Sequence, residues 1–116
     1  MLEALARRFD IRRDWAVFLE RYPVLLMPNS GQRQFAIDAD CGSPELVLKP
    51  LAAQAPLLGT AMLGLPGLAV PTGVVNGLPT GVQLVSGKSR EDLALRAGEI
   101  IERAAGSSAL DHLAPH

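Results

Sequence analysis

A lysine and two serines near the C-terminus have side chains that could act as a base and a nucleophile. Lys88 is one, and Gly106-Ser107-Ser108 has the composition of a nucleophile loop. A Ser–Lys pair acts only within hydrogen-bond reach and beside an oxyanion hole. A helix predicted at residues 89–105 would separate the two groups by on the order of 25 Å, at 1.5 Å per residue. We therefore interpret them as residues at opposite ends of a helix.

Cysteine, histidine and aspartate offer two further combinations. Cys41 could act as a nucleophile only beside a base, and His112 and His116 lie in a C-terminal tail. Asp38 and Asp40 supply two carboxylates without a histidine or a Gly-kinked ligand loop, which is too few donors for a metal ion. The sequence therefore predicts no catalytic residue, no metal site and no cofactor in this chain.

The stretch that organises the chain is residues 64–87, GLPGLAVPTGVVNGLPTGVQLVSG. It lies within a longer window, residues 50–87, that contains no Asp, Glu, Lys or Arg. Hiding apolar surface from water is worth roughly 25 cal/mol per Å², so we expect this window to be buried. Prolines and glycines interrupt it throughout, and an interior proline costs a helix roughly 3 kcal/mol. The pattern therefore argues against a transmembrane helix.

Two short apolar runs in this stretch, at residues 68–70 and 82–85, predict strands that are covered on both faces. Asn76-Gly77 between them predicts a hairpin, because both residues tolerate the positive φ of a tight turn. Gln83 would face opposite to its apolar neighbours on such a strand. Its amide either bonds within the sheet, which is the favoured role, or points toward a cleft.

Helices are predicted before this stretch. Residues 2–22 carry helical spacing in two phases, so the helix either rotates its buried stripe or restarts near Asp10. A short strand at residues 24–27 and a polar loop follow. Residues 44–58 predict a second helix, which Pro50 kinks or restarts. Its residues expected to pack on the sheet are Leu46, Val47, Leu51 and Leu58.

The last helix is predicted at residues 89–105. Ser89 is expected to cap it, with Asp92 completing a shortened capping box, and Gly106 is expected to end it. The predicted buried stripe consists of Leu93, Ala97, Ile100, Ile101 and Ala104.

Three motifs in a fixed order resemble a known family. They are VLLMP at residues 24–28, GLPGLAVPTG at residues 64–73 and GLPTGVQLV at residues 77–85. Over roughly residues 11–105, their order and spacing resemble the C-terminal part of the amidase signature family, whose members are Ser-cisSer-Lys hydrolases that cleave amide C–N bonds. The resemblance implies an α/β fold in which helices pack on part of a mixed β-sheet, including a hairpin at Asn76-Gly77.

The resemblance also implies a role for polar side chains. Loops that follow strands in this family can line the substrate cleft, which makes Asn29, Ser30 and Gln32 candidates for substrate binding, together with Gln34 and Gln83. Solvated loop residues are the alternative interpretation. The family's nucleophile lies in a segment of the type G-G-S-S-G-G, with a lysine further upstream, and these residues contain neither.

Length and composition restrict the class of protein to which the chain can belong. A chain of 116 residues with 48% hydrophobic content is expected to form one globular domain, residues 1–116. A net charge of −1 predicts no general attraction to nucleic acid or to anionic membranes. One cysteine, without a leader that has a basic start and an apolar middle, predicts a cytoplasmic location.

About three strands are too few to enclose two apolar faces. We therefore expect the chain to pair with a catalytic N-terminal portion or to self-associate through exposed apolar sheet. Three interpretations stay open: the C-terminal portion of an amide hydrolase, a non-catalytic amidase-derived subunit or interaction module, and an unrelated small α/β domain.

Overall fold

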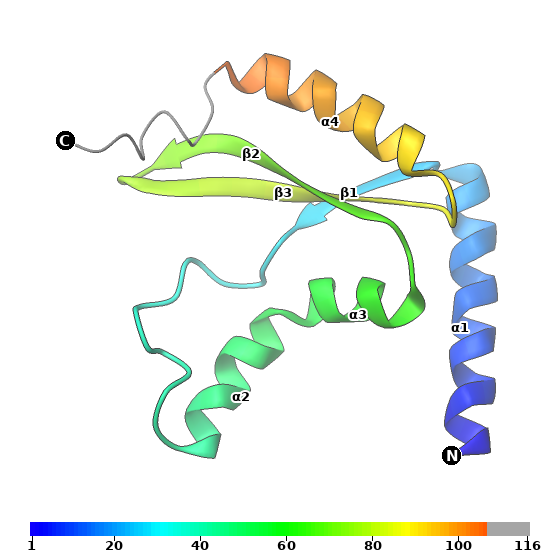
Figure 1. The fold of residues 1–116 in the computed structure, drawn as a ribbon, viewed down its shortest axis with the longest axis horizontal. Helices are drawn as coiled ribbons and strands as arrows, with labels where there is room; N and C mark the ends of the chain where they lie inside the picture. Colours follow the sequence, from blue (N-terminus) through cyan, green and yellow to red (C-terminus); the bar gives the residue numbers. More distant parts are fainter. Residues whose placement is uncertain (107–116) are drawn as a thin grey trace.

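The computed structural model describes residues 1–106, with four helices and three strands. In chain order these are α1 (Leu2–Arg21), β1 (Val24–Pro28), α2 (Pro44–Ala53), α3 (Ala55–Leu63), β2 (Gly67–Val75), β3 (Leu78–Ser86) and α4 (Glu91–Ala105). The strands form one antiparallel sheet in the order β1-β3-β2. Figure 1 shows α4 above this sheet, α2 and α3 below it, and α1 running past one end. The arrangement confirms the predicted α/β class with helices packed on part of a β-sheet.

β2 and β3 form the predicted hairpin. Val75 pairs with Leu78, and the two residues between them, Asn76 and Gly77, have φ values of 54° and 77°. Positive φ at both central positions is the geometry of the tight primed turn that Asn-Gly favours. The turn therefore sets the register of the strands from Val75 back to Gly73, beyond which the pairing shifts by one residue between Gly73 and Pro71.

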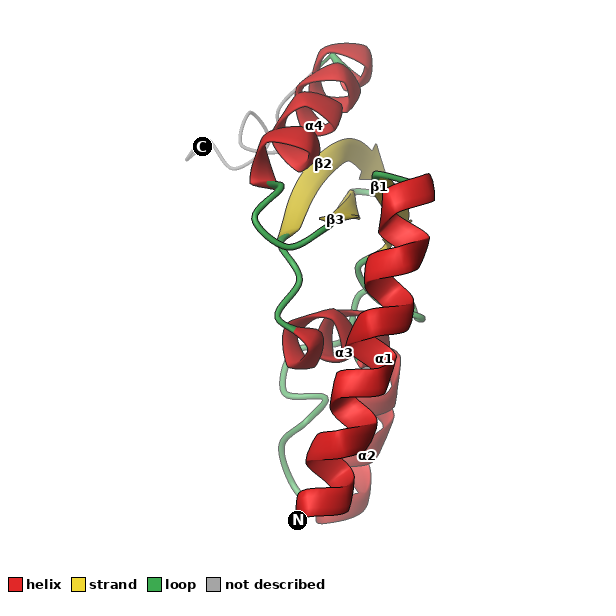
Figure 2. Cartoon of the chain, turned by 90° about the vertical axis from the view of Figure 1, so that its right-hand side faces the viewer, coloured by secondary structure: helices red, strands yellow, loops and turns green. Residues whose placement is uncertain are grey.

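The core lies between the sheet and α4, on the upper side of the sheet in the end view of Figure 2. Val70 of β2, Leu84 of β3 and Ala94 of α4 are buried together. A Cβ added at Gly98 of α4 would lie only 2.6 Å from Cδ2 of Leu68. The absence of a side chain at Gly98 therefore allows α4 to approach β2 closely.

The face of α4 that contacts the sheet differs in part from the predicted stripe. The buried and half-buried residues include Leu93, Ala94, Ala97, Gly98 and Ile101. Ile100 and Ala104 were predicted to be buried but are exposed, Ile100 by 68%. The small residues at positions 94 and 98 lie closest to the strands, so the contact face is centred on them and Ile100 lies outside it.

The start of α4 also differs from prediction. The helix begins at Glu91, with Arg90 as N-cap and no side-chain cap hydrogen bond. Ser89 has φ of 59° and lies in a turn in which the Arg90 N–H donates to the Gly87 carbonyl. The predicted Ser89 cap and its capping box are wrong, because this turn places Ser89 one residue too early. Arg90 instead donates to both oxygens of Asp92, and this hydrogen bonding lowers the pKa of the Asp92 carboxyl.

α1 is one continuous helix and does not restart near Asp10. The two apolar phases of its sequence have different environments. Leu2 and Phe9 of the first phase are exposed. In the second phase Leu19 is buried and Trp15 is half-buried, but the other three residues are exposed, namely Ile11, Phe18 and Tyr22. The C-terminal half of α1 is thus the half that packs against the described part of the chain.

The helical region after the polar loop breaks at Gln54 and not at Pro50. Pro50 lies inside α2, whereas Pro56 lies in the first turn of α3, and the two helices are bent by 71°. Pro56 has no N–H with which to continue the hydrogen bonds of α2. Within residues 1–106 no single helix is long and apolar enough to cross a membrane, and only this bent pair meets the length and composition required.

The predicted packing of this region on the sheet is wrong. Each of the four side chains concerned is exposed, namely Leu46, Val47, Leu51 and Leu58. After the bend α3 lies beneath the sheet, where Thr60 and Leu63 are buried, and α2 runs away from it (Figure 1). The break at Gln54 therefore sets the orientation of α2 relative to the sheet, and the apolar side chains of α2 do not.

The turn predicts one stability difference. Gly77→Val should lower the free energy of unfolding by roughly 1 kcal/mol or more, because a β-branched residue is strained at positive φ. Asn76→Gly should be nearly neutral, because glycine adopts positive φ without strain. Thermal unfolding of both variants beside the wild type measures the difference. Equal melting midpoints for wild type and Gly77→Val would contradict the tight turn.

The face of α4 that contacts the sheet predicts a second difference in stability. Ala94→Asp should destabilise the protein by about 3 kcal/mol, because it buries an unpaired carboxylate beneath the helix. Ile100→Asp should change stability by no more than about 0.5 kcal/mol, since that side chain is exposed. Urea unfolding of the two variants tests the assignment. A comparable loss in Ile100→Asp would show that Ile100 packs on the sheet after all.

Candidate functional site

A cleft of about 540 Å³ lies between the loop that follows β1 and the start of β3. Its wall contains four of the five predicted candidates, namely Asn29, Ser30, Gln32 and Gln34. The remaining lining residues are Pro28, Gly31, Arg33, Phe35, Gln54, Pro79, Thr80 and Gly81. The structure therefore brings the predicted loop residues together with residues that are distant in sequence.

Strand pairing brings the two walls together. β1 ends at Pro28 opposite Val82, so the chain leaves β1 beside the first residues of β3. Gln34 then crosses to the hairpin, where its Nε2 donates to the Pro79 carbonyl at 2.6 Å. The Gly31 N–H donates to the Ala53 carbonyl at 2.8 Å, which fastens the loop to the end of α2. These two hydrogen bonds position the loop as one wall of the cleft.

The side chain of Asn29 packs against Gly81 of β3. Its Oδ1 is buried and has no hydrogen-bond partner among residues 1–106. A Cβ added at Gly81 would lie 2.9 Å from the Val70 carbonyl oxygen and 3.3 Å from Nδ2 of Asn29. Glycine at position 81 thus leaves the space that the Asn29 amide occupies. Buried acceptors are normally paired, and Oδ1 of Asn29 is an exception among the described residues, as are Oε1 of Gln83 and Oγ of Ser86.

Gln83 does not line this cleft. Its Nε2 donates to the hydroxyl of Thr60 on α3 at 3.2 Å, and both side chains are buried. A Cβ added at Gly67 would lie 2.9 Å from the same Nε2, so glycine at position 67 leaves room for the amide. The amide therefore joins β3 to α3, which is the geometry of a structural role.

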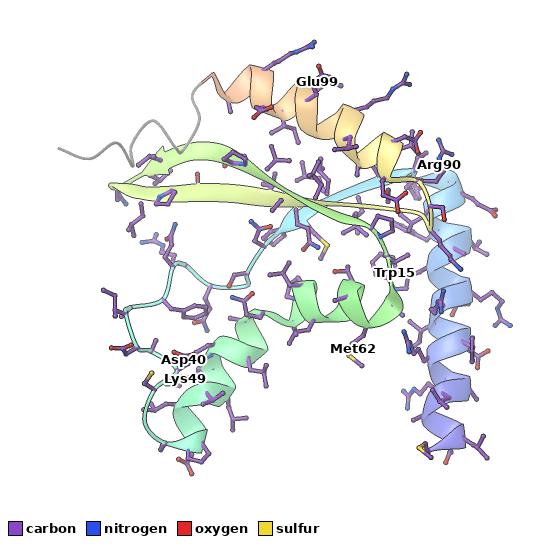
Figure 3. The ribbon with its side chains drawn as sticks, viewed as in Figure 1. Trp15, Asp40, Lys49, Met62, Arg90 and Glu99 are labelled. Atoms are coloured by element: carbon purple, nitrogen blue, oxygen red, sulfur yellow. The ribbon has the colours of Figure 1, made fainter. Side chains whose placement is uncertain are left out.

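The other candidates for chemistry lie apart from the cleft. Cys41 is exposed, and its Sγ lies 3.8 Å from Asp38 Oδ1 and 3.9 Å from Asp40 Oδ1. Figure 3 shows Asp40 in the part of the loop beside α2, away from the sheet. In the described part of the chain no group of three or more His, Cys, Asp and Glu side chains could hold a metal ion. Ser107, Ser108 and the two histidines lie outside the described residues.

Sequence reasoning missed Gln54, Thr80 and Arg33 as lining residues. Gln54 did have a signal, because it is a polar residue in the charge-free window immediately before the helix break. Thr80 belongs to the motif GLPTG, where its hydroxyl donates to the Gly73 carbonyl at 3.1 Å. The arginine is the sole charged residue of the cleft wall, and no carboxylate of the described residues lines it.

No protein family profile matches the chain, but comparison with known proteins finds several relatives. An indoleacetamide hydrolase of Bradyrhizobium japonicum is 38% identical over 106 residues, which are 90% of this chain and 23% of the relative. An indoleacetamide hydrolase of Bradyrhizobium diazoefficiens is 39% identical over 106 residues, 20% of its length. A glutamyl-tRNA(Gln) amidotransferase subunit of Desulforudis audaxviator is 36% identical over 97 residues, 19% of its length.

These relatives define a class of enzymes that act on amide groups. These relatives confirm the resemblance seen in the ordered motifs of the sequence. The chain is related to the enzymes of the amidase signature family and matches their C-terminal part. It spans about one fifth of the length of these curated relatives.

The contact beneath the sheet predicts an energetic coupling. Thr60→Val should leave the buried Gln83 amide without its partner and cost about 1–2 kcal/mol of stability. A double-mutant cycle adds Gln83→Leu. The double variant should lose about 1 kcal/mol less stability than the sum of the two single losses, because Gln83→Leu removes the amide that Thr60→Val leaves unpaired. Chemical unfolding of the four proteins gives the coupling. Additive losses would show that the two side chains do not interact.

Proposed function

We propose that this chain is the C-terminal portion of an amidase-type hydrolase, whose complete form hydrolyses an amide C–N bond. The portion would complete the fold and form one wall of the substrate cleft. The observation that supports this proposal most directly is 38% identity to an indoleacetamide hydrolase across 90% of the chain. The cleft beside Asn29 adds a structural reason, because it gathers polar loop residues where a ligand could enter.

The chemical step would come from other residues of the complete enzyme. The sequence has no Gly-Ser-rich segment of the family type, and Lys88 follows the far end of β3 from the cleft. The strand residues 81–86 alone separate Lys88 from Thr80 by about 20 Å at about 3.3 Å per residue. A nucleophile and its base must lie within hydrogen-bond reach. Lys88 therefore does not serve a nucleophile bound at this cleft.

The cleft wall is suited to holding a neutral amide. Asn29, Ser30 and Gln32 provide amide and hydroxyl groups without charge, and the Asn29 acceptor is unused within the described residues. A few fixed polar groups among apolar ones orient a ligand in most pockets.

A non-catalytic subunit or interaction module derived from an amidase is the second candidate. The observation that favours it is the match to only 19–23% of the relatives, with no nucleophile segment in the sequence. Such a module would bind a partner without contributing a residue to catalysis. Loss of activity in a cleft variant that still assembles with the catalytic portion would separate the first candidate from this one.

Assembly with the catalytic portion is part of the proposal. β1 and β2 are the outer strands of the three, and Leu26 on β1 is 57% exposed. Unpaired edges and exposed apolar side chains are sites of association. We propose that the catalytic portion covers them in the complete enzyme, and self-association of the isolated chain is the competing outcome.

The proposal predicts activity only in the assembled state. The chain alone should not hydrolyse indoleacetamide above background, because its sequence has no Gly-Ser-rich nucleophile segment of the family type. Co-expressed with the Bradyrhizobium japonicum relative shortened by its matched 106 residues, it should restore release of ammonia. Asn29→Leu in that complex should lower kcat/KM about tenfold, equivalent to about 1.4 kcal/mol.

The control variant is Asn76→Gly, which lies outside the cleft and should leave kcat/KM unchanged. An inactive complex of wild-type chain with the shortened relative would count against the proposed function. Full activity in Asn29→Leu would show that this asparagine does not bind the substrate. Hydrolysis by the chain alone would contradict the assignment of the chemical step to residues outside it.

A further inference from the structure

A second and more apolar groove, of about 710 Å³, lies between α1 and α3. Its walls include Ile11 and Trp15 of α1, Pro56 and Leu63 of α3, and Met27 of β1. Figure 3 shows Trp15 on the side of α1 that faces α3. The groove lies on the opposite side of the sheet from α4 and is separate from the polar cleft, with which it shares no lining residue.

The first half of α1 has little support of its own. Leu19 is the buried residue of this helix, and Leu2 and Phe9 are exposed by 85% and 67%. A helix in water is stable chiefly where an apolar face packs against other structure. The first half of α1, which forms one wall of the groove, therefore requires a further element beside it.

The charges at the groove restrict what that element can be. Arg7 and Arg8 are its charged lining residues, and none of the ion pairs found in residues 1–106 involves either of them. A matching partner is therefore apolar where it meets Trp15 and carries acidic side chains where it meets the arginines. Contacts in a two-fold dimer are reciprocal between the same two patches, and the lining of the groove contains no acidic residue, so neither arginine would meet a carboxylate in the groove of a second copy. The charge pattern thus disfavours a second copy.

The relatives supply a different occupant. This chain matches 23% and 20% of the two indoleacetamide hydrolases, so most of their polypeptide has no counterpart in the chain. We propose that the groove between α1 and α3 is the docking site for a segment of that catalytic portion, apolar toward Trp15 and acidic toward Arg7 and Arg8. This inference rests on the proposed function and assigns the contact surface within it.

The single tryptophan of the chain provides a direct probe of the groove. The chain is labelled with 5-fluorotryptophan, purified, and mixed with the separately purified, unlabelled Bradyrhizobium japonicum relative that lacks its matched residues. The Trp15 fluorine resonance should shift in the complex and become insensitive to exchange of H₂O for D₂O. A Trp15 resonance that is unchanged in an active complex would overturn the docking site and leave the proposed function standing.

Two matched variants locate the contact. Met62 on the groove and Ile100 on α4 are exposed by 69% and 68%, so neither substitution should unfold the isolated chain. Met62→Glu should raise the Kd of the complex at least tenfold, whereas Ile100→Glu should change it less than twofold. Arg7→Gln combined with Arg8→Gln should also raise the Kd about tenfold and flatten its dependence on salt.

The remaining outcomes each decide the proposal. Equal weakening by Met62→Glu and Ile100→Glu, or no effect of either, would show that binding does not depend on the groove. A fluorine shift that grows with the concentration of the chain alone, with dimers in sedimentation, would identify a second copy as the occupant and overturn the inference. Absence of any complex or activity would remove both this inference and the proposed function.

Discussion

The structure depends on the hydrogen bonding of β3 to a strand on each side. Pairing with both β1 and β2 leaves Leu84 and Val85 only 1% and 0% exposed. Alternate side chains of a strand point to opposite faces, so Leu84 joins the core beneath α4 while Gln83 reaches Thr60 of α3. The first residues of β3 continue past the end of β1 and form a wall of the cleft. One strand thus positions the core, the lower helix and the candidate site.

The elements that could be predicted from the sequence have local determinants. Asn76-Gly77 specifies its turn through the φ values that these two residues tolerate, and the structure has that turn. Pro23 after α1 and the left-handed Gly106 after α4 mark helix ends in the same local way. In each case a neighbouring residue or two contain the physical cause, so no knowledge of the tertiary contacts is needed.

The features that could not be predicted depend on contacts between distant residues. The sequence of α4 contains an isoleucine at position 100 that satisfies helical spacing, but the close approach to β2 selects the smaller face around Ala94 and Gly98. The cleft shows the same limit. Asn29 and Gln32 are neighbours in sequence, whereas Gln54 joins them only because the Gly31 N–H bonds to the end of α2.

The shape of the chain and the residues of its cleft both indicate that further polypeptide is needed beside it. A compact domain of this length has a radius of gyration of about 13 Å, whereas this chain has 16.7 Å and is only 18 Å thick along its shortest axis. So thin a body cannot cover both its sheet and its helices, which explains the exposed side chains of α1 and β1. Among residues 1–106, the lining of the cleft consists of uncharged residues and one arginine. On the proposed function, one further body of polypeptide supplies both the missing thickness and the missing chemistry, so association and catalysis would be gained in the same step.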